Sequence, residues 1–218
     1  MRTVDVVQGS DEWRLARLGK VGASMVADAT ARDRSGKGWG ITRQRLMARL
    51  AAERLTGELT DTFKSASMER GTEVEPEARE FYGFVYSRKI ETVGLVLHPT
   101  IEMACASPDA LVDGDGLAQF KCPDQHTHMA TLLGASIDGG YLKQMQWEMA
   151  CTGRQWCDFV SYDPRWPDEM RLHVRRVERD PVMIAELENQ VREFLAEVAA
   201  TVDQLVKLYR ASTPMAAE

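Results

Sequence analysis

The stretch ASPDALVDGDGLAQFKCP, residues 106–123, contains two short apolar runs separated by a double Asp-Gly turn. Asp-Gly between apolar runs is among the strongest sequence signals of a β-hairpin. We therefore expect strands at residues 110–112 and 117–121, joined by Asp113-Gly114-Asp115-Gly116. Further short apolar runs, which extend the hairpin into a strand meander, lie at residues 92–97 and 103–106.

The predicted hairpin carries polar side chains that suit metal chemistry. Asp109 opens one arm, and Gln119 and Lys121 lie two positions apart on the other. Because side chains alternate along a strand, residues 119 and 121 share one face, while Phe120 faces the core and can present its carbonyl. Carboxylate and carbonyl oxygens suit Mg²⁺, with Mn²⁺ as a substitute, and a lysine can activate a water and offset phosphate charge. The pattern favours a metal-dependent phosphodiesterase site.

An acid-rich segment precedes the hairpin. Residues 67–83 have a helical pattern, and we expect Pro76 to kink this helix or to force a restart, since proline lacks the backbone donor. Most of its acids are interpreted as a solvated face. Glu75 is the one that we select as a candidate active-site acid, because of the hairpin that follows.

Helical and strand patterns over the rest of the chain predict an α/β fold, a small mixed sheet flanked by helices. We expect one domain over residues 1–211 and a disordered tail over residues 212–218. The loop at residues 32–40, rich in glycine and charge, is predicted to be mobile. Further helices are expected from Ser10 to Gly19, from Ser24, at 41–56, after residue 123, at 141–151 and from residue 180; further strands are expected at 155–162 and 170–177.

Composition limits the class of protein. The 218 residues carry a net charge of −6, which argues against a uniformly basic DNA-coating surface but not against a locally positive cleft. The four cysteines form no C-x-x-C pair, so neither a zinc site nor a disulfide framework is indicated. No apolar run approaches the roughly 20 residues of a membrane span, and no signal peptide is recognisable. We expect a cytoplasmic protein with no membrane association.

Several motifs resemble, in the same order, the phage lambda exonuclease and YqaJ-type viral recombinase family. The main ones are Ala106–Leu111, Gly116–Pro123 and Gln144-Met145-Gln146. Weaker matches occur at residues 13–19, 23–24, 34–37, 39, 70–75 and 162–165, so the resemblance covers nearly the whole chain.

The resemblance implies a restriction-endonuclease-like core of the PD-(D/E)-x-K class. It implies an exonuclease that degrades one strand of duplex DNA from a 5′ end and leaves a 3′ single-stranded tail. Members of the family form ring-shaped homotrimers and act with a single-strand annealing recombinase in phage recombination. The expected setting is therefore a phage or prophage protein in a bacterial host cell.

The resemblance also assigns roles to individual residues. It implies that Asp109, residue 119 and the Phe120 carbonyl bind the metal and that Lys121, Glu75 and Gln144 complete the catalytic set. A guanidinium and hydroxyls together recognise a phosphate. The residues implied to contact DNA are Arg17, Ser24 and Ser107 around the 5′ phosphate, Met68 as an apolar wedge at the duplex end, and Arg34 on a loop.

Position 119 departs from the family, which has glutamate there. Gln119 keeps the shape and one oxygen but removes a negative charge, so we expect weak or misplaced metal binding and a nearly inactive protein. The preferred explanation is a deliberate substitution that traps DNA or metal without cleavage, and the other is a naturally altered site.

Two other readings compete with the exonuclease. An endonuclease or junction resolvase of the same fold would nick covalently closed circular DNA. A DNA-end-binding recombination accessory with a decayed site would bind ends without turnover, even with glutamate at position 119.

Overall fold

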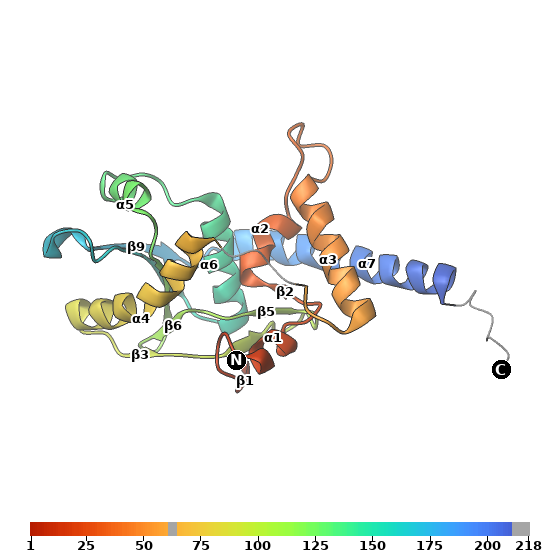
Figure 1. The fold of residues 1–218 in the computed structure, drawn as a ribbon, viewed down its shortest axis with the longest axis horizontal. Helices are drawn as coiled ribbons and strands as arrows, with labels where there is room; N and C mark the ends of the chain where they lie inside the picture. Colours follow the sequence, from red (N-terminus) through yellow and green to blue (C-terminus); the bar gives the residue numbers. More distant parts are fainter. Residues whose placement is uncertain (61–64, 211–218) are drawn as a thin grey trace.

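The computed structural model describes residues 1–60 and 65–210. It confirms the α/β fold, but with two small mixed sheets flanked by helices in place of the single sheet expected (Figure 1). The meander is split between the sheets because its first two strands pair with Arg2–Val4 and Val21–Gly22, whereas its last two pair with Ile90–Glu91 and Trp156–Tyr162. The predicted tail at residues 212–218 lies outside the described residues.

The larger sheet contains the predicted hairpin. Its strand order is β3-β6-β7-β8-β9, in which β7 and β8 are parallel and the other neighbours are antiparallel. Ala110 pairs with Ala118 across the hairpin, and Asp113 adopts a φ of 49° in the turn. The strands are β3 (Ile90–Glu91), β6 (Ala110–Val112), β7 (Gly116–Lys121), β8 (Trp156–Tyr162) and β9 (Leu172–Glu178).

The smaller sheet has the order β1-β4-β5-β2, with β2 and β5 parallel. The expected strand at 92–97 is too long, because only its second half pairs, and β1 and β2 were not predicted because they are too short to show a pattern. The strands are β1 (Arg2–Val4), β2 (Val21–Gly22), β4 (Leu95–Leu97) and β5 (Ala104–Ala106). The chain passes from this sheet to the larger one through Ser107-Pro108-Asp109.

Seven α-helices lie within the described residues: α1 (Asp11–Ala16), α2 (Val26–Ala29), α3 (Ile41–Thr56), α4 (Ala66–Tyr86), α5 (Gln125–Leu132), α6 (Gly139–Thr152) and α7 (Pro181–Tyr209). Ser10 caps α1 as predicted, since its hydroxyl accepts from the Trp13 amide at 3.2 Å, but α1 ends before Gly19. Ser24 caps no helix and lies within the 3-10 turn Ala23–Met25. The predicted restart at Pro76 is wrong, because α4 continues through it.

The larger sheet lies between α4 and α6. On one face Ala118 and Phe120 of β7 pack in a cluster with Ala78 and Tyr82 of α4. On the other face Leu117 packs in a cluster with the α6 residues Met145 and Met149. Side chains of β7 therefore alternate between the two helices, as the period of a strand requires.

Helix α6 contacts both sheets. Its Trp147 belongs to the cluster of the smaller sheet, while Met145 and Met149 pack on the larger one. Every residue from Met145 to Cys151 is buried as a result. Two of these residues, Gln146 and Glu148, are polar, and the helix therefore carries a glutamate into the interior.

The surface loop at residues 32–40 projects beyond α3 (Figure 1). Arg32 and Trp39 form an isolated β-bridge at its base, and the Trp39 ring lies 3.7 Å from the guanidinium carbon of Arg43. The loop is exposed as expected, and its mobility stays a prediction. In residues 1–60 and 65–210, no helix is long and apolar enough to cross a membrane.

Helix α7 is attached to the body by a buried ion pair. Arg43 of α3 is 1% exposed and donates to Glu197 at 2.7 and 3.0 Å and to the Ala29 carbonyl at 3.0 Å. Removing one partner of such a pair leaves an uncompensated buried charge. Beyond Val198 the helix continues beside α3, where Arg210 donates to the Leu55 carbonyl at 2.8 Å, and its C-terminal end lies at the edge of the molecule (Figure 1).

We predict that Glu197→Ala lowers the free energy of unfolding by about 2–3 kcal/mol, because it leaves the buried Arg43 guanidinium without its carboxylate partner. The effect is smaller than for a fully buried pair, since Glu197 is partly exposed. Urea unfolding in EDTA measures this change. Glu193→Ala, at an exposed position of the same helix, is the control and shifts stability by less than about 0.5 kcal/mol. Equal effects of the two variants would contradict the prediction.

Candidate active site

Asp109 is tied to the central strand of the hairpin. Its carboxylate accepts a hydrogen bond from the Phe120 amide at 2.8 Å. Continuing the β6–β7 register by one residue places Asp109 opposite Gln119. Burial raises the pKa of Asp109, although the Lys121 charge and the Phe120 amide act in the opposite direction. The predicted neighbours Asp109 and Lys121 are therefore brought together.

Lys121 lies on the α6 face of the sheet. Its ammonium group is 4.5 Å from the ring centroid of Tyr141, in the first turns of α6. Gln119, two residues earlier, must point the same way, since Leu117 also packs toward α6. The predicted shared face of residues 119 and 121 agrees with this arrangement.

Gln119 is fully buried, and neither atom of its amide group has a hydrogen-bond partner among the described residues. Leaving a buried polar group unsatisfied costs about 1–3 kcal/mol. Such a group in a folded protein calls for an explanation, and a bound ion is one of the usual ones.

Glu75 reaches the same region from α4. The helix crosses the end of β7, where Arg70 donates to the carbonyls of Cys122 and Pro123 at 3.3 and 3.1 Å. The Glu75 carboxylate accepts from Arg79 at 2.7 Å. Burial raises the pKa of Glu75, the Asp109 charge raises it further, and Arg79 and Lys121 oppose the shift. The charges of Asp109 and Lys121 therefore both act on Glu75, the acid that the sequence analysis selected as a candidate.

Gln144 leads to a residue that the sequence analysis did not select. Its amide donates to Glu148 one helical turn later at 3.0 Å. Glu148 is fully buried, and its second oxygen has no partner among the described residues. Burial and the nearby charge of Asp109 raise the pKa of Glu148 to about 8. The available signal was a lone acid within the otherwise mostly apolar run 145–151.

We call Glu75, Asp109 and Glu148, whose carboxyl groups all interact electrostatically with Lys121, the carboxylate cluster. Its three acids come from α4, from the link between the two sheets and from α6. Asp109 raises the pKa of both other carboxyls, and Lys121 lowers it for all three. Arg79 also opposes the charges of Glu75 and Asp109, and a bound cation would relieve the repulsion that remains.

A second group of predicted residues lies around Trp13. The indole donates to the Ser107 hydroxyl at 2.8 Å, and the Arg17 guanidinium lies 4.0 Å from the centre of the Trp13 ring. Burial lowers the pKa of Arg17. We call Trp13, Arg17 and Ser107 the Arg17 pocket.

Gly22 brings the predicted Ser24 close to this pocket. A Cβ at Gly22 would lie 2.7 Å from Nη2 of Arg17, so only glycine leaves room for the guanidinium. Ser24 is exposed in the turn directly after Gly22, and Gly22 pairs with Cys105, two residues before Ser107. Arg17, Ser24 and Ser107 therefore occupy one region.

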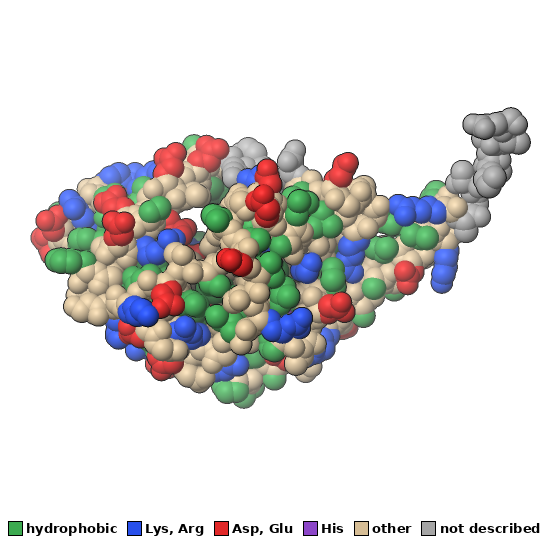
Figure 2. Space-filling view, turned by 90° about the horizontal axis from the view of Figure 1, so that it is seen from below, with side chains coloured by type: hydrophobic (Ala, Val, Ile, Leu, Met, Phe, Trp, Pro, Cys, Tyr) green, Lys and Arg blue, Asp and Glu red, His purple; other side chains and the backbone are tan. Residues whose placement is uncertain are grey.

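A groove of about 1340 Å³ is lined by residues from both groups, by Trp13 and Arg17 of the Arg17 pocket and by Glu75 of the carboxylate cluster. Trp13 and Arg17 line one part of it, and Glu75 and Arg79 line another. Figure 2 shows this side of the molecule hollowed, with acidic and basic side chains around the hollow. Arg49, which the sequence analysis did not select, also lines the groove beside Arg17.

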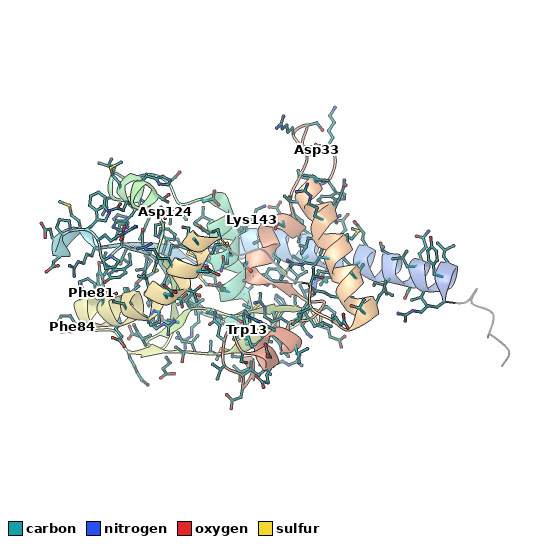
Figure 3. The ribbon with its side chains drawn as sticks, in the orientation of Figure 1. Trp13, Asp33, Phe81, Phe84, Asp124 and Lys143 are labelled. Atoms are coloured by element: carbon teal, nitrogen blue, oxygen red, sulfur yellow. The ribbon has the colours of Figure 1, made fainter. Side chains whose placement is uncertain are left out.

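Two predicted DNA contacts lie apart from these groups. Met68 is 58% exposed at the start of α4, one turn before the groove residue Thr72. Arg34 is exposed on the projecting loop next to Asp33, which lies across the molecule from Trp13 (Figure 3). The structure thus leaves Met68 at the edge of the groove and does not bring Arg34 to it.

The oxygen atoms around Gln119 suit a hard divalent cation. Asp109, Glu148, the Gln119 amide and the Phe120 carbonyl are all oxygen donors of the kind that Mg²⁺ prefers. The unpartnered oxygens of Gln119 and Glu148 agree with a ligand at this place. Within the described residues no three His, Cys, Asp or Glu side chains, those of the carboxylate cluster included, are placed to hold one metal ion together. The neutral oxygens of Gln119 and Phe120 would complete the ligands of such an ion.

Similar proteins include exonucleases. The chain is 46% identical to an alkaline exonuclease, LHK-Exo, from Laribacter hongkongensis; the match covers 94% of this chain and 100% of that one, with a TM-score of 0.86. A structure of LHK-Exo in complex with dAMP matches over the same shares, at 46% identity with a TM-score of 0.87. A phage-related exonuclease from Haemophilus somnus 129PT, 18% identical, shares the fold, with a TM-score of 0.61 over 86% of this chain and 95% of that one. No curated protein is significantly similar.

A lysine among carboxylates, near a groove that holds a half-buried arginine, is typical of enzymes that act on phosphodiesters. The profile of the YqaJ-like viral recombinase domain matches residues 12–155, which include every predicted site residue. The chain belongs to this family, as the sequence motifs predicted.

The raised pKa of Glu148 makes a prediction for the metal-free protein. The folded chain keeps this proton up to about pH 8, whereas the ordinary value is 4.5, so the unfolded chain releases it first. The contribution of Glu148 to the free energy of unfolding therefore falls as the pH rises through this window. We expect Glu148→Gln to flatten that slope in urea titrations in EDTA, while Glu193→Gln keeps it. Parallel pH profiles for Glu148→Gln and the parent would contradict the assignment.

Proposed function

We propose that the protein is a Mg²⁺-dependent exonuclease that digests one strand of duplex DNA from its 5′ end. The observation that carries the proposal is the groove that runs from the Arg17 pocket to Glu75 of the carboxylate cluster. A terminal phosphate held at one end of such a groove presents the next phosphodiester to the acids and the lysine at the other. The 46% identity to an alkaline exonuclease supports this reading.

Different side chains bind the terminal phosphate, balance the phosphate charge and hold the metal ion. Arg17 and the hydroxyls of Ser107 and Ser24 bind the 5′ phosphate, and the Trp13 indole orients Ser107 and stacks on Arg17. Lys121 balances phosphate charge and orients the attacking water. Asp109, Gln119 and the Phe120 carbonyl would hold Mg²⁺, or Mn²⁺ in its place. When bound, such an ion makes a water nucleophilic at neutral pH and stabilises the leaving oxygen.

The setting follows from the family. A viral recombinase domain fits a phage or prophage protein that acts in the cytoplasm of a bacterial host and makes 3′ tails for a single-strand annealing recombinase. A homotrimeric ring around the DNA would let the enzyme remain on one substrate through many cycles. The Met68 side chain, exposed beside the groove, fits an apolar wedge at the duplex end.

Gln119 bears on the level of activity. On the basis of this residue alone, the site lacks one negative charge and the protein is impaired, as the sequence predicts. Glutamate at position 119 then strengthens metal binding and digestion.

We predict that the protein, or its Gln119→Glu variant, digests linear duplex DNA with Mg²⁺ and leaves covalently closed circular DNA intact. Gel electrophoresis with strand-specific 5′ and 3′ labels measures both the substrate preference and the direction. Nicked circles would indicate an endonuclease. If both proteins bind DNA ends but digest no DNA, the protein is instead a DNA-end-binding recombination accessory.

We predict that Arg17→Ala removes the preference for 5′-phosphorylated ends. Losing a charge-assisted contact to the phosphate lowers the ratio of Kd for 5′-hydroxyl to Kd for 5′-phosphoryl duplex by about 10-fold or more. Fluorescence anisotropy in EDTA measures this ratio independently of turnover. Arg45→Ala, which removes an equal charge at an exposed position of α3, leaves the ratio unchanged. An unchanged ratio in Arg17→Ala would refute the pocket assignment.

A further inference from the structure

Glu148 is a buried carboxylate whose position neither the hairpin nor the phosphate pocket explains. Glu148 has no exposed surface. Among the described residues, the one hydrogen bond to its carboxylate comes from the Gln144 amide at 3.0 Å. The other carboxylate oxygen is buried without a partner. A buried carboxylate with an unpartnered oxygen lowers the stability of the fold unless a cation or a hydrogen-bond donor binds that oxygen.

The geometry puts Glu148 across from Gln119. Gln119 lies on β7 between Leu117, which packs in a cluster with Met145 and Met149, and Lys121, which lies over Tyr141. Residues 141, 145, 148 and 149 recur at helical spacing and therefore share one side of α6. The strand thus presents its amide to the side of the helix that carries the glutamate.

Three unsatisfied buried atoms belong to these two residues, both amide atoms of Gln119 and one oxygen of Glu148. The Gln119 amide nitrogen does not donate to the Glu148 oxygen, although the two groups are a donor and an acceptor. Asp109 adds a second carboxylate, since the β6–β7 register places it opposite Gln119. A divalent cation bound by Asp109, Glu148 and the Gln119 oxygen would satisfy the acceptors and relieve the repulsion between the two acids.

We propose that Glu148 supplies the metal-binding carboxylate that position 119 lacks, so that the acid is provided by helix α6 in place of strand β7. Gln144 is a positioning residue, since its amide holds one carboxylate oxygen and leaves the other free for the ion. This inference rests on the proposed metal-dependent nuclease function.

The number of negative charges at the site supports the replacement of a glutamate at position 119 by Glu148. Asp109 with glutamate at 119 provides two negative charges, and Asp109 with Glu148 provides the same two. Mg²⁺ usually keeps several waters and takes only one or two carboxylates from a protein. The site of this chain is then complete, and the impairment expected from Gln119 alone does not follow.

Calorimetric titration of the whole protein with Mn²⁺ tests the assignment. We expect Glu148→Gln to weaken Mn²⁺ binding by at least about 10-fold, which even the loss of an outer-shell partner can cause. The double variant Gln119→Glu/Glu148→Gln, which moves the acid from helix to strand, restores the affinity of the parent. Glu193→Gln makes the same charge change at an exposed position and has no effect.

Thermal unfolding separates a metal ligand from a structural residue. Mn²⁺ raises the Tm of the parent and of the double variant, because a ligand that binds only the folded state stabilises it. Glu148→Gln loses this rise while remaining folded in EDTA. Glu148→Asp, which keeps the charge but withdraws it by one methylene, gives an intermediate rise and covers the case in which the amide variant does not fold.

The outcomes distinguish the two proposals. If Glu148→Gln binds Mn²⁺ as tightly as the parent, or changes the Tm in EDTA without reducing the Mn²⁺ response, the Glu148 inference is wrong. If in addition Gln119→Glu digests linear DNA, the nuclease proposal still stands. If neither the parent nor Gln119→Glu binds Mn²⁺ or digests DNA, the nuclease proposal fails, and the Glu148 inference fails with it.

Discussion

The hydrogen bond from the Phe120 amide to the Asp109 carboxylate joins the two halves of the molecule. It anchors the link Ser107-Pro108-Asp109, through which the chain passes from one sheet to the other, to the central strand of the larger sheet. Ser107, at one end of the link, bonds to Trp13, and Asp109, at the other end, belongs to the carboxylate cluster. Two residues span no more than about 7 Å, so the link fixes the spacing of the two binding regions.

The packing of α6 against both sheets gives the site its electrostatic character. Because the helix is buried from Met145 to Cys151, any polar residue on it is removed from water. Glu148 and Gln119 are both buried with unpartnered atoms, in a place where an unsatisfied group is costly. A cation relieves this cost, and the same burial strengthens its attraction to the two carboxylates.

The sequence predicted the parts of the site that depend on local pattern. The Asp-Gly turn, the alternation along residues 117–121 and the motif order led to Asp109, Lys121, Glu75 and Gln144, which the fold brings together. It could not predict the division into two sheets, because β1, β2 and β3 have only two or three residues each and their partners are distant. It also missed Glu148, since a glutamate one turn from Gln144 looks like a surface residue until the helix is known to lie between two cores.

The most direct measurement is a crystal structure with Mn²⁺ and a 5′-phosphorylated duplex. The account predicts an anomalous peak bounded by Asp109, Glu148 and the Gln119 oxygen, with the terminal phosphate at Arg17 and Ser107. A manganese ion that lies away from Asp109, or one bound there while Glu148 keeps only its bond to Gln144, would contradict it.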